Sequence, residues 1–109
     1  MIGNKSGYEV HSFDDLEAVG VSDAARTTGV NFALQVTVAD IGTNVVIRLE
    51  ASVDGLNYFN LDDNNSDITI TANGTYGYAL SGCPVQYVRV RLVSISGGSP
   101  TVSSRMGAT

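Results

Sequence analysis

The chain has 109 residues, a length typical of one domain with a modest hydrophobic core. It carries eleven acidic against six basic residues, a formal net charge of -5, and the basic residues are scattered along the sequence. Nucleic-acid-binding proteins need clustered positive charge, so we expect no nucleic acid among the partners. No apolar run approaches a membrane span and the first residues lack a signal-peptide pattern, so we expect a soluble protein without a membrane partner.

Residues 1–29 predict an extended N-terminal arm. This segment is rich in Gly, Ser, Asp and Thr, and its apolar residues come singly or in short pieces. Because it has too little apolar surface to fold alone, we expect the arm to become ordered only against a partner. Deletion of residues 1–20 should then leave the rest of the chain folded. The predicted contact residues of the arm are Tyr8, Val10, Phe13, Leu16 and Val19.

Residues 30–109 predict a β-sandwich domain. In 30–38 and 44–53 apolar and polar residues alternate with a period of two, which is typical of antiparallel strands with one buried face. In the second of these strands Arg48 and Glu50 are expected to point outward. The side chains expected to point inward are Val30, Phe32, Leu34, Val36 and Val38, followed by Val45, Ile47, Leu49, Ala51 and Val53.

Turn-forming dipeptides punctuate the rest of the chain. Asp54-Gly55 and Asn73-Gly74 favour two-residue type I′ turns, so we expect a tight hairpin within residues 48–61. Further strands are expected at 67–72, 75–80 and 86–94, and at 100–106 after the Gly97-Gly98 turn. About seven strands result, without a helical period, which predicts an all-β antiparallel sandwich. The alternation does not distinguish an Ig-like from a jelly-roll strand order.

No group of residues predicts catalysis. His11, the one histidine, lies far in the sequence from Cys83, the one cysteine, and no G-x-S-x-G motif occurs. The polar run Asp62–Asp67 offers oxygen ligands, but the EF-hand pattern fails at Ile68 and Gly74, where it needs Gly and Glu. We interpret this run as a solvated loop, with a calcium site in an irregular loop as the alternative. We therefore expect no enzyme, no cofactor and no metal.

A carbohydrate-binding module is the main alternative that the residues alone support. Sandwich proteins that bind sugars present aromatic side chains, and the candidates here include Tyr58, Phe59 and Tyr87. The chain has no Trp, and Tyr76 and Tyr78 share a face with an apolar neighbour, which favours a place in the core or in an interface. If the protein instead has a structural role, we predict Tyr58 and Phe59, near the hairpin, as contacts with a partner protein.

The order of elements in residues 30–109 resembles a type of small β-sandwich found in the virions of tailed bacteriophages. The resemblance rests on S-x-D-G followed by an aromatic residue and Leu in 52–61, on PV-x-Y-V-R-V in 84–90, on Gly97-Gly98, and on a closing strand at 100–106. Tyr58 stands near the place where such sequences often carry Trp. Within this setting the chain looks most like a capsid decoration, or cement, protein.

The resemblance implies a non-enzymatic structural protein. It implies a homotrimer that bridges major capsid proteins and stabilises the expanded shell, with an arm that reaches a neighbour. It places the protein on the capsid surface of the virion, after assembly in the cytoplasm of the host bacterium. The alternative within the same setting is a tail, neck or fibre-adaptor protein.

Overall fold

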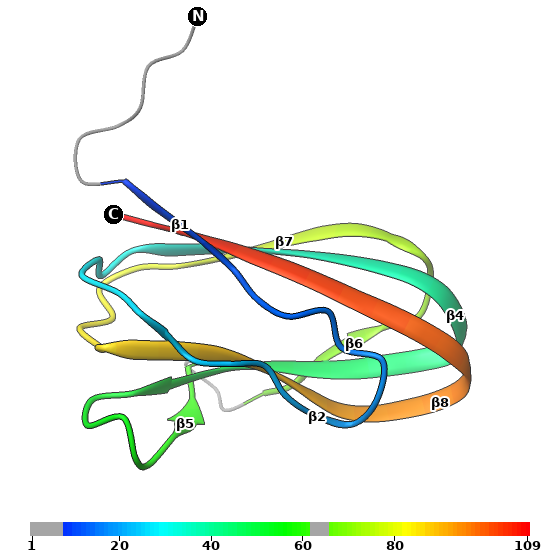
Figure 1. Ribbon diagram of the computed structural model, residues 1–109. Helices are drawn as coiled ribbons and strands as arrows, with labels where there is room; N and C mark the ends of the chain where they lie inside the picture. The colour runs from blue at the N-terminus through cyan, green and yellow to red at the C-terminus, as the bar shows by residue number, and fades with distance from the viewer. Residues whose placement is uncertain (1–7, 62–65) are drawn as a thin grey trace, which may run out of the picture.

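The structure, a computed structural model, describes residues 8–61 and 66–109. Every regular element in these residues is a strand, and the strands join into one antiparallel sheet (Figure 1). The predicted all-β antiparallel fold is therefore confirmed. The strands are β1 (Glu9–Ser12), β2 (Gly20–Val21), β3 (Ala25–Arg26), β4 (Phe32–Ser52), β5 (Phe59–Asn60), β6 (Ile68–Ile70), β7 (Gly74–Leu80) and β8 (Tyr87–Ala108).

Two long strands form the frame of the molecule. β4 has 21 residues and β8 has 22, and they pair along their whole length. Both bend near their middle, where the register shifts around Ala39, Ile41 and Asn44 (Figure 1). Gly97 and Gly98 have φ values of 71° and 66° at this bend, a conformation that glycine adopts without a steric penalty. The residues predicted as separate strands are thus two halves of one bent strand, in β4 and again in β8.

The bend folds the sheet into two layers. The first layer contains β1, residues 101–108 of β8, residues 32–39 of β4, and β7. The second layer contains the other halves of β4 and β8, with β2 and β3 beside β8 and with β5 and β6 beside β4. The sandwich is therefore one curled sheet whose two halves face each other across the core (Figure 1).

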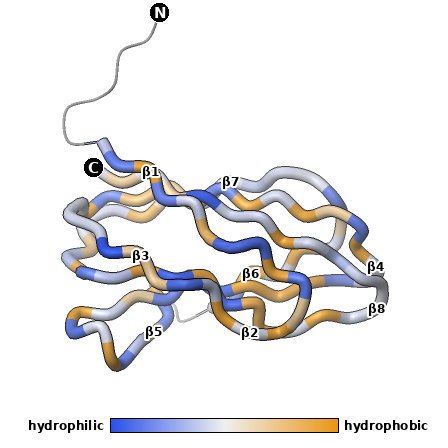
Figure 2. Tube along the Cα trace, in the orientation of Figure 1, coloured by the Kyte–Doolittle hydropathy of each residue, from blue (hydrophilic) through white to orange (hydrophobic). Residues whose placement is uncertain are grey.

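The period-two alternation predicted the inward side of both halves of β4. Val36, Val45 and Ile47 are fully buried, and the alternation of apolar and polar residues along the chain is visible in Figure 2. Val30 and Val53 were expected inside as well, but they are 41% and 63% exposed because they lie just beyond the two ends of β4. Other core residues are Phe32, Leu34, Val38, Leu49, Ala51, Leu61, Ile70, Val85, Val88, Val90, Leu92, Val102, Met106 and Ala108.

The segment from residue 8 to 29 differs from the expected arm, because it lies along the outer edge of β8. β1 pairs with the end of β8, β2 and β3 pair with its first half, and a bridge joins Leu16 to Val102 between them. Phe13 and Leu16 are only 7% and 9% exposed, so the expectation that they are available to a partner is wrong. This segment needs no core of its own, because the open edge of β8 supplies backbone partners and the sandwich accepts both side chains.

The predicted type I′ turns are also wrong. A type I′ turn needs positive φ at both central residues, and among the described non-glycine residues only Asp40 has it. The hairpin between β4 and β5 exists, with Ala51 opposite Phe59, but its connection spans residues 53–58. β6 and β7 each pair with β4, so Asn73 does not lie in a hairpin turn; its side-chain oxygen accepts a hydrogen bond from the Ile41 amide at 2.9 Å.

Candidate functional site

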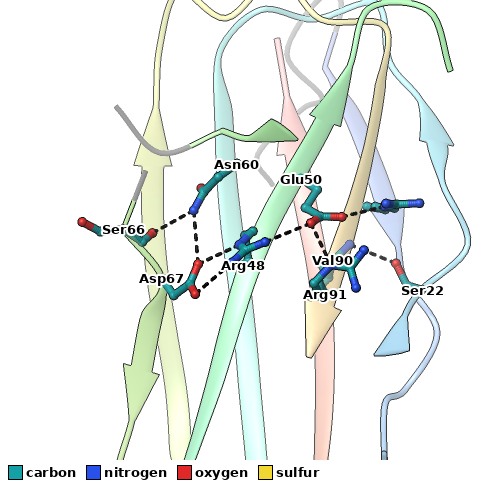
Figure 3. Close-up of polar contacts among 9 residues, drawn as sticks. Ser22, Arg48, Glu50, Asn60, Ser66, Asp67, Val90 and Arg91 are labelled. Atoms are coloured by element: carbon teal, nitrogen blue, oxygen red, sulfur yellow. Dashed lines mark hydrogen bonds and ion pairs between the residues drawn. The ribbon is translucent and has the colours of Figure 1, made fainter. Parts of the chain in front are cut away.

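A buried carboxylate lies among three arginines on the outer face of the second layer (Figure 3). Glu50 of β4 is 4% exposed. Its two oxygens accept hydrogen bonds from Nε of Arg89 at 2.8 Å and from Nε of Arg91 at 2.7 Å, and Nη1 of Arg48 lies 3.4 Å away. The register explains this arrangement, because Glu50 faces Arg89 and Arg48 faces Arg91 across β4 and β8. The predicted outward direction of Arg48 and Glu50 therefore holds.

A second carboxylate extends the charged network to the edge of the layer. Asp67 binds Arg48 through two contacts, at 2.7 Å to Nε and 3.0 Å to Nη2. Asn60 of β5 donates to Asp67 and to the Ser66 carbonyl, both at 3.2 Å (Figure 3). The network therefore joins β4, β5 and β8 to the residues that precede β6.

The pKa values of Glu50 and Asp67 keep both carboxylates of this network charged. Burial raises the pKa of Glu50, but hydrogen bonds from Arg91 and Arg89 and their positive charges outweigh burial, so the pKa falls below its ordinary value. Hydrogen bonds from Arg48 lower the pKa of Asp67 in the same way. Ionised carboxylates bound in this way are suited to structural support, because Glu50 joins β4 to β8 and Asp67 joins its own segment to β4 and β5 at fixed distances.

The loop at residues 53–58 is organised by its own side chains. The Ser52 hydroxyl accepts hydrogen bonds from the amides of Asp54 and Gly55, at 3.2 and 2.8 Å, and donates to the Asp54 carboxylate at 2.9 Å. The same carboxylate oxygen accepts from the amides of Leu56 and Asn57, at 2.8 and 2.9 Å. These backbone hydrogen bonds hold the pKa of Asp54 well below its usual range. The loop thus has a defined backbone although it is exposed.

The charged network also contacts the base of this loop, at Tyr58. The guanidinium carbon of Arg89 lies 3.7 Å from the centre of the Tyr58 ring, a cation–π contact, while its Nε is bound to Glu50. Tyr87 packs against Gly55, where a β-carbon would approach the ring to 3.1 Å. Gly55 has a φ of 78°, so both its backbone conformation and its contact with Tyr87 favour glycine.

Three large apolar side chains of this region are exposed to solvent. Leu56 is 84% exposed, Val53 63% and Phe59 46%. We call these residues the 53–59 surface. A rigid backbone that holds apolar side chains in water is typical of a binding site, because little conformational entropy is lost when a partner covers it. Val53 and Leu56 were not predicted from the sequence as exposed contact residues, and Val53 was expected in the core. The Asp-Gly pair before Leu56 was the signal that could have indicated a loop here.

The predicted contact residues do not form one site. Tyr8 and Val10 are 45% and 60% exposed on the first layer, and Val19 is 61% exposed between β1 and β2. Tyr58 is half-buried beneath Arg89, so it supports the loop more than it contacts solvent, whereas Phe59 belongs to the exposed set. Their roles in a partner interface stay predictions.

The outer face of the first layer carries a shallow groove of about 540 Å³. Val10, Gly107, Ala33 and Ala79 lie in one row across β1, β8, β4 and β7, so its floor is made of small side chains. Tyr8 lies over Gly107, where a β-carbon would come within 2.6 Å of the tyrosine hydroxyl. This groove and the 53–59 surface lie on different layers.

Other residues considered for chemistry lie apart. His11 on β1 has its Nε2 3.7 Å from Glu9, and Cys83 is half-buried after β7. Asp67 is occupied by Arg48, while residues 62–65 of the polar run lie outside the described residues. In the part of the chain that the structure describes, no three His, Cys, Asp or Glu side chains come together in an arrangement that could hold a metal ion.

None of the residues in 8–61 and 66–109 belongs to an apolar helix of membrane-spanning length.

The fold is similar to that of solved structures of a prophage-derived protein and of a pilus protein. No protein-family model and no curated protein matches the sequence. The SPBc2 prophage-derived protein YomS has a TM-score of 0.58 over 93% of this chain and 93% of its own, at 13% identity. A protein of Bacillus endospore appendages, described as a family of disulfide-linked pili, has a TM-score of 0.53 over 100% of this chain and 97% of its own, at 9% identity. At these identities the likeness establishes a shared fold.

Proposed function

We propose that the protein is a non-enzymatic structural subunit of a tailed-phage virion that decorates the capsid as a homotrimer. The observation that carries the proposal is the 53–59 surface, three exposed apolar side chains on a loop fixed by Ser52 and Asp54. The likeness of its fold to a prophage-derived protein and the sequence resemblance to decoration proteins support the phage setting. The major capsid protein is the proposed partner.

The charged network contributes to this function by keeping the loop in position. Each contact between a small protein and a large shell contributes little binding free energy. A loop that is ordered before it binds loses less conformational entropy, so more of this free energy is retained. Glu50 fixes Arg89, and Arg89 in turn covers Tyr58 at the base of the loop. With several copies on one particle, even weak contacts of this kind give firm retention.

Binding of purified protein to expanded shells of the corresponding phage tests the proposal. Leu56→Asp places a charge at the most exposed apolar position of the loop and should reduce binding at least about tenfold. Val30→Asp is the matched control, because Val30 is also an exposed apolar residue but lies outside the 53–59 surface. Equal binding of both variants and the unmodified protein would contradict the role of the loop.

A subunit of a tail, neck or appendage filament is the second candidate. It is favoured by the likeness to a pilus protein, which extends over the whole chain. The number of copies per particle separates the two, because a shell decoration protein is present in hundreds of copies and a neck protein in one or two rings. A count near six or twelve would replace the capsid proposal by this one.

A further inference from the structure

β7 forms an open edge of the first layer. It pairs with β4 on one side, in an unbroken register from Gly74 opposite Val38 to Leu80 opposite Phe32, and no described strand pairs with its other side. Its sequence, GTYGYAL, contains no charged residue and no proline. Edge strands of soluble proteins usually carry such residues or a bulge, because a regular neutral edge pairs readily with another strand.

The other edges of the described sheet are protected. β2, β3 and β5 have two residues each and β6 has three, which is too short for extended pairing. β1 has four residues, and its Glu9 and His11 side chains are half-buried on the inner side of the layer. A charged residue that points inward is a recognised way of blocking an edge. In this part of the chain β7 is therefore the edge without protection.

Nothing in the described fold of a single chain requires a glycine at position 77, in the centre of β7. It has no positive φ, it is exposed, and a β-carbon built on it would meet no atom within 4 Å. Glycine weakens a strand interior, and in strands it often marks a place where another backbone approaches closely. The structure thus leaves room at Gly77 that nothing in the described chain uses.

The sequence around Gly77 is complementary to itself in the antiparallel sense. If two copies of β7 meet about a two-fold axis at Gly77, Tyr76 of each faces Tyr78 of the other, and Thr75 faces Ala79. Aromatic residues are favourable cross-strand partners, and both tyrosines are half-buried at the edge and would be covered further. A two-fold contact requires this kind of self-complementarity, because residue i contacts j and j contacts i.

We propose that β7 is an interface between two copies of this chain, which pair antiparallel about a two-fold axis at Gly77 and join their first layers into one continuous sheet. The interface is independent of the 53–59 surface, which lies on the second layer. It is also compatible with a three-fold contact elsewhere, since a two-fold and a three-fold axis together give pairs of trimers.

Analytical ultracentrifugation over a concentration series tests the proposal. The unmodified protein should form a species with an even number of chains. Gly77→Lys should halve its mass and weaken association about tenfold or more, because two lysines face each other at the axis. Ser12→Lys is the matched control, since Ser12 is exposed on β1, the protected edge of the same layer, and its mass should stay unchanged. Circular dichroism establishes that both variants are folded.

Mixing of oppositely charged variants locates the axis. Gly77→Lys and Gly77→Glu should each give the half-mass species alone, and an equimolar mixture should restore the full mass, because Lys then faces Glu. A mixture that keeps the half mass would overturn the placement of the axis at Gly77. An unmodified protein that stays a monomer or a trimer at every concentration would overturn self-pairing, and would leave β7 to a strand of another protein.

Discussion

Replacement of Glu50 by glutamine tests the charged network most directly. Glu50→Gln keeps the size of the side chain but removes the charge that Arg89 and Arg91 share at 2.8 and 2.7 Å. A hydrogen bond to a charged group contributes about 1.5 to 3 kcal/mol, and loss of one partner of a fully buried ion pair costs about 3 to 5 kcal/mol. The Arg89 and Arg91 side chains are 21% and 35% exposed, so water can solvate them in the variant and the loss of stability is smaller than for a fully buried pair.

We therefore expect the free energy of unfolding to fall by about 2 to 3 kcal/mol, and the melting temperature by roughly 10 °C or more. Urea unfolding at neutral pH, followed by circular dichroism, measures the change. Glu17→Gln is the matched control, because Glu17 is exposed and its substitution should change stability by less than about 0.5 kcal/mol.

The same variant predicts a pH dependence. The pKa of Glu50 in the folded protein lies below its ordinary value of 4.5. The charge of Glu50 therefore contributes fully to the free energy of unfolding above pH 4.5, and this contribution is lost as the pH falls through the lower pKa of the folded state. The difference in stability between the unmodified protein and Glu50→Gln should thus shrink in acid. A difference below about 0.5 kcal/mol at neutral pH, or one that does not shrink, would refute the structural role of the network.

Three further substitutions test the loop and the N-terminal segment. Gly55→Ala should lower the free energy of unfolding by about 1 to 2 kcal/mol, because alanine is strained at a φ of 78° and its β-carbon crowds Tyr87; an unchanged urea midpoint would argue against this loop conformation. Phe13→Ala should cost about 3 kcal/mol in the same assay, and a loss below about 1 kcal/mol would mean that the segment does not pack on the sandwich. Asp54→Asn should shift the amide resonance of Leu56, which in the unmodified protein should stay constant as the pH falls through 3.8, the ordinary pKa of aspartate; a titration at that pH would contradict the hydrogen bonds to Asp54.

Local patterns in the sequence were sufficient to determine which side chains of the strands face inward. Val36 and Ile47 are buried, and Arg48 and Glu50 point outward, as the period of two predicted. This agreement has a simple cause, because successive side chains of a strand point to opposite faces whatever the strand pairs with. Gly97 likewise marked a change of chain direction, although the structure shows a bend inside a continuous strand where a turn between two strands was expected.

Only the tertiary structure decided which strands pair with each other and which edges of the sheet are covered. Phe13 looked like an exposed arm residue until β8 supplied an edge for its segment, and Leu56 could be recognised as exposed only once the loop was fixed by Asp54. Glu50 and Arg89 are separated by 39 positions, and their contact depends on the register between β4 and β8. Alternation is a property of neighbouring residues, whereas register and edges arise when distant segments bury a common core, so no local pattern specifies them.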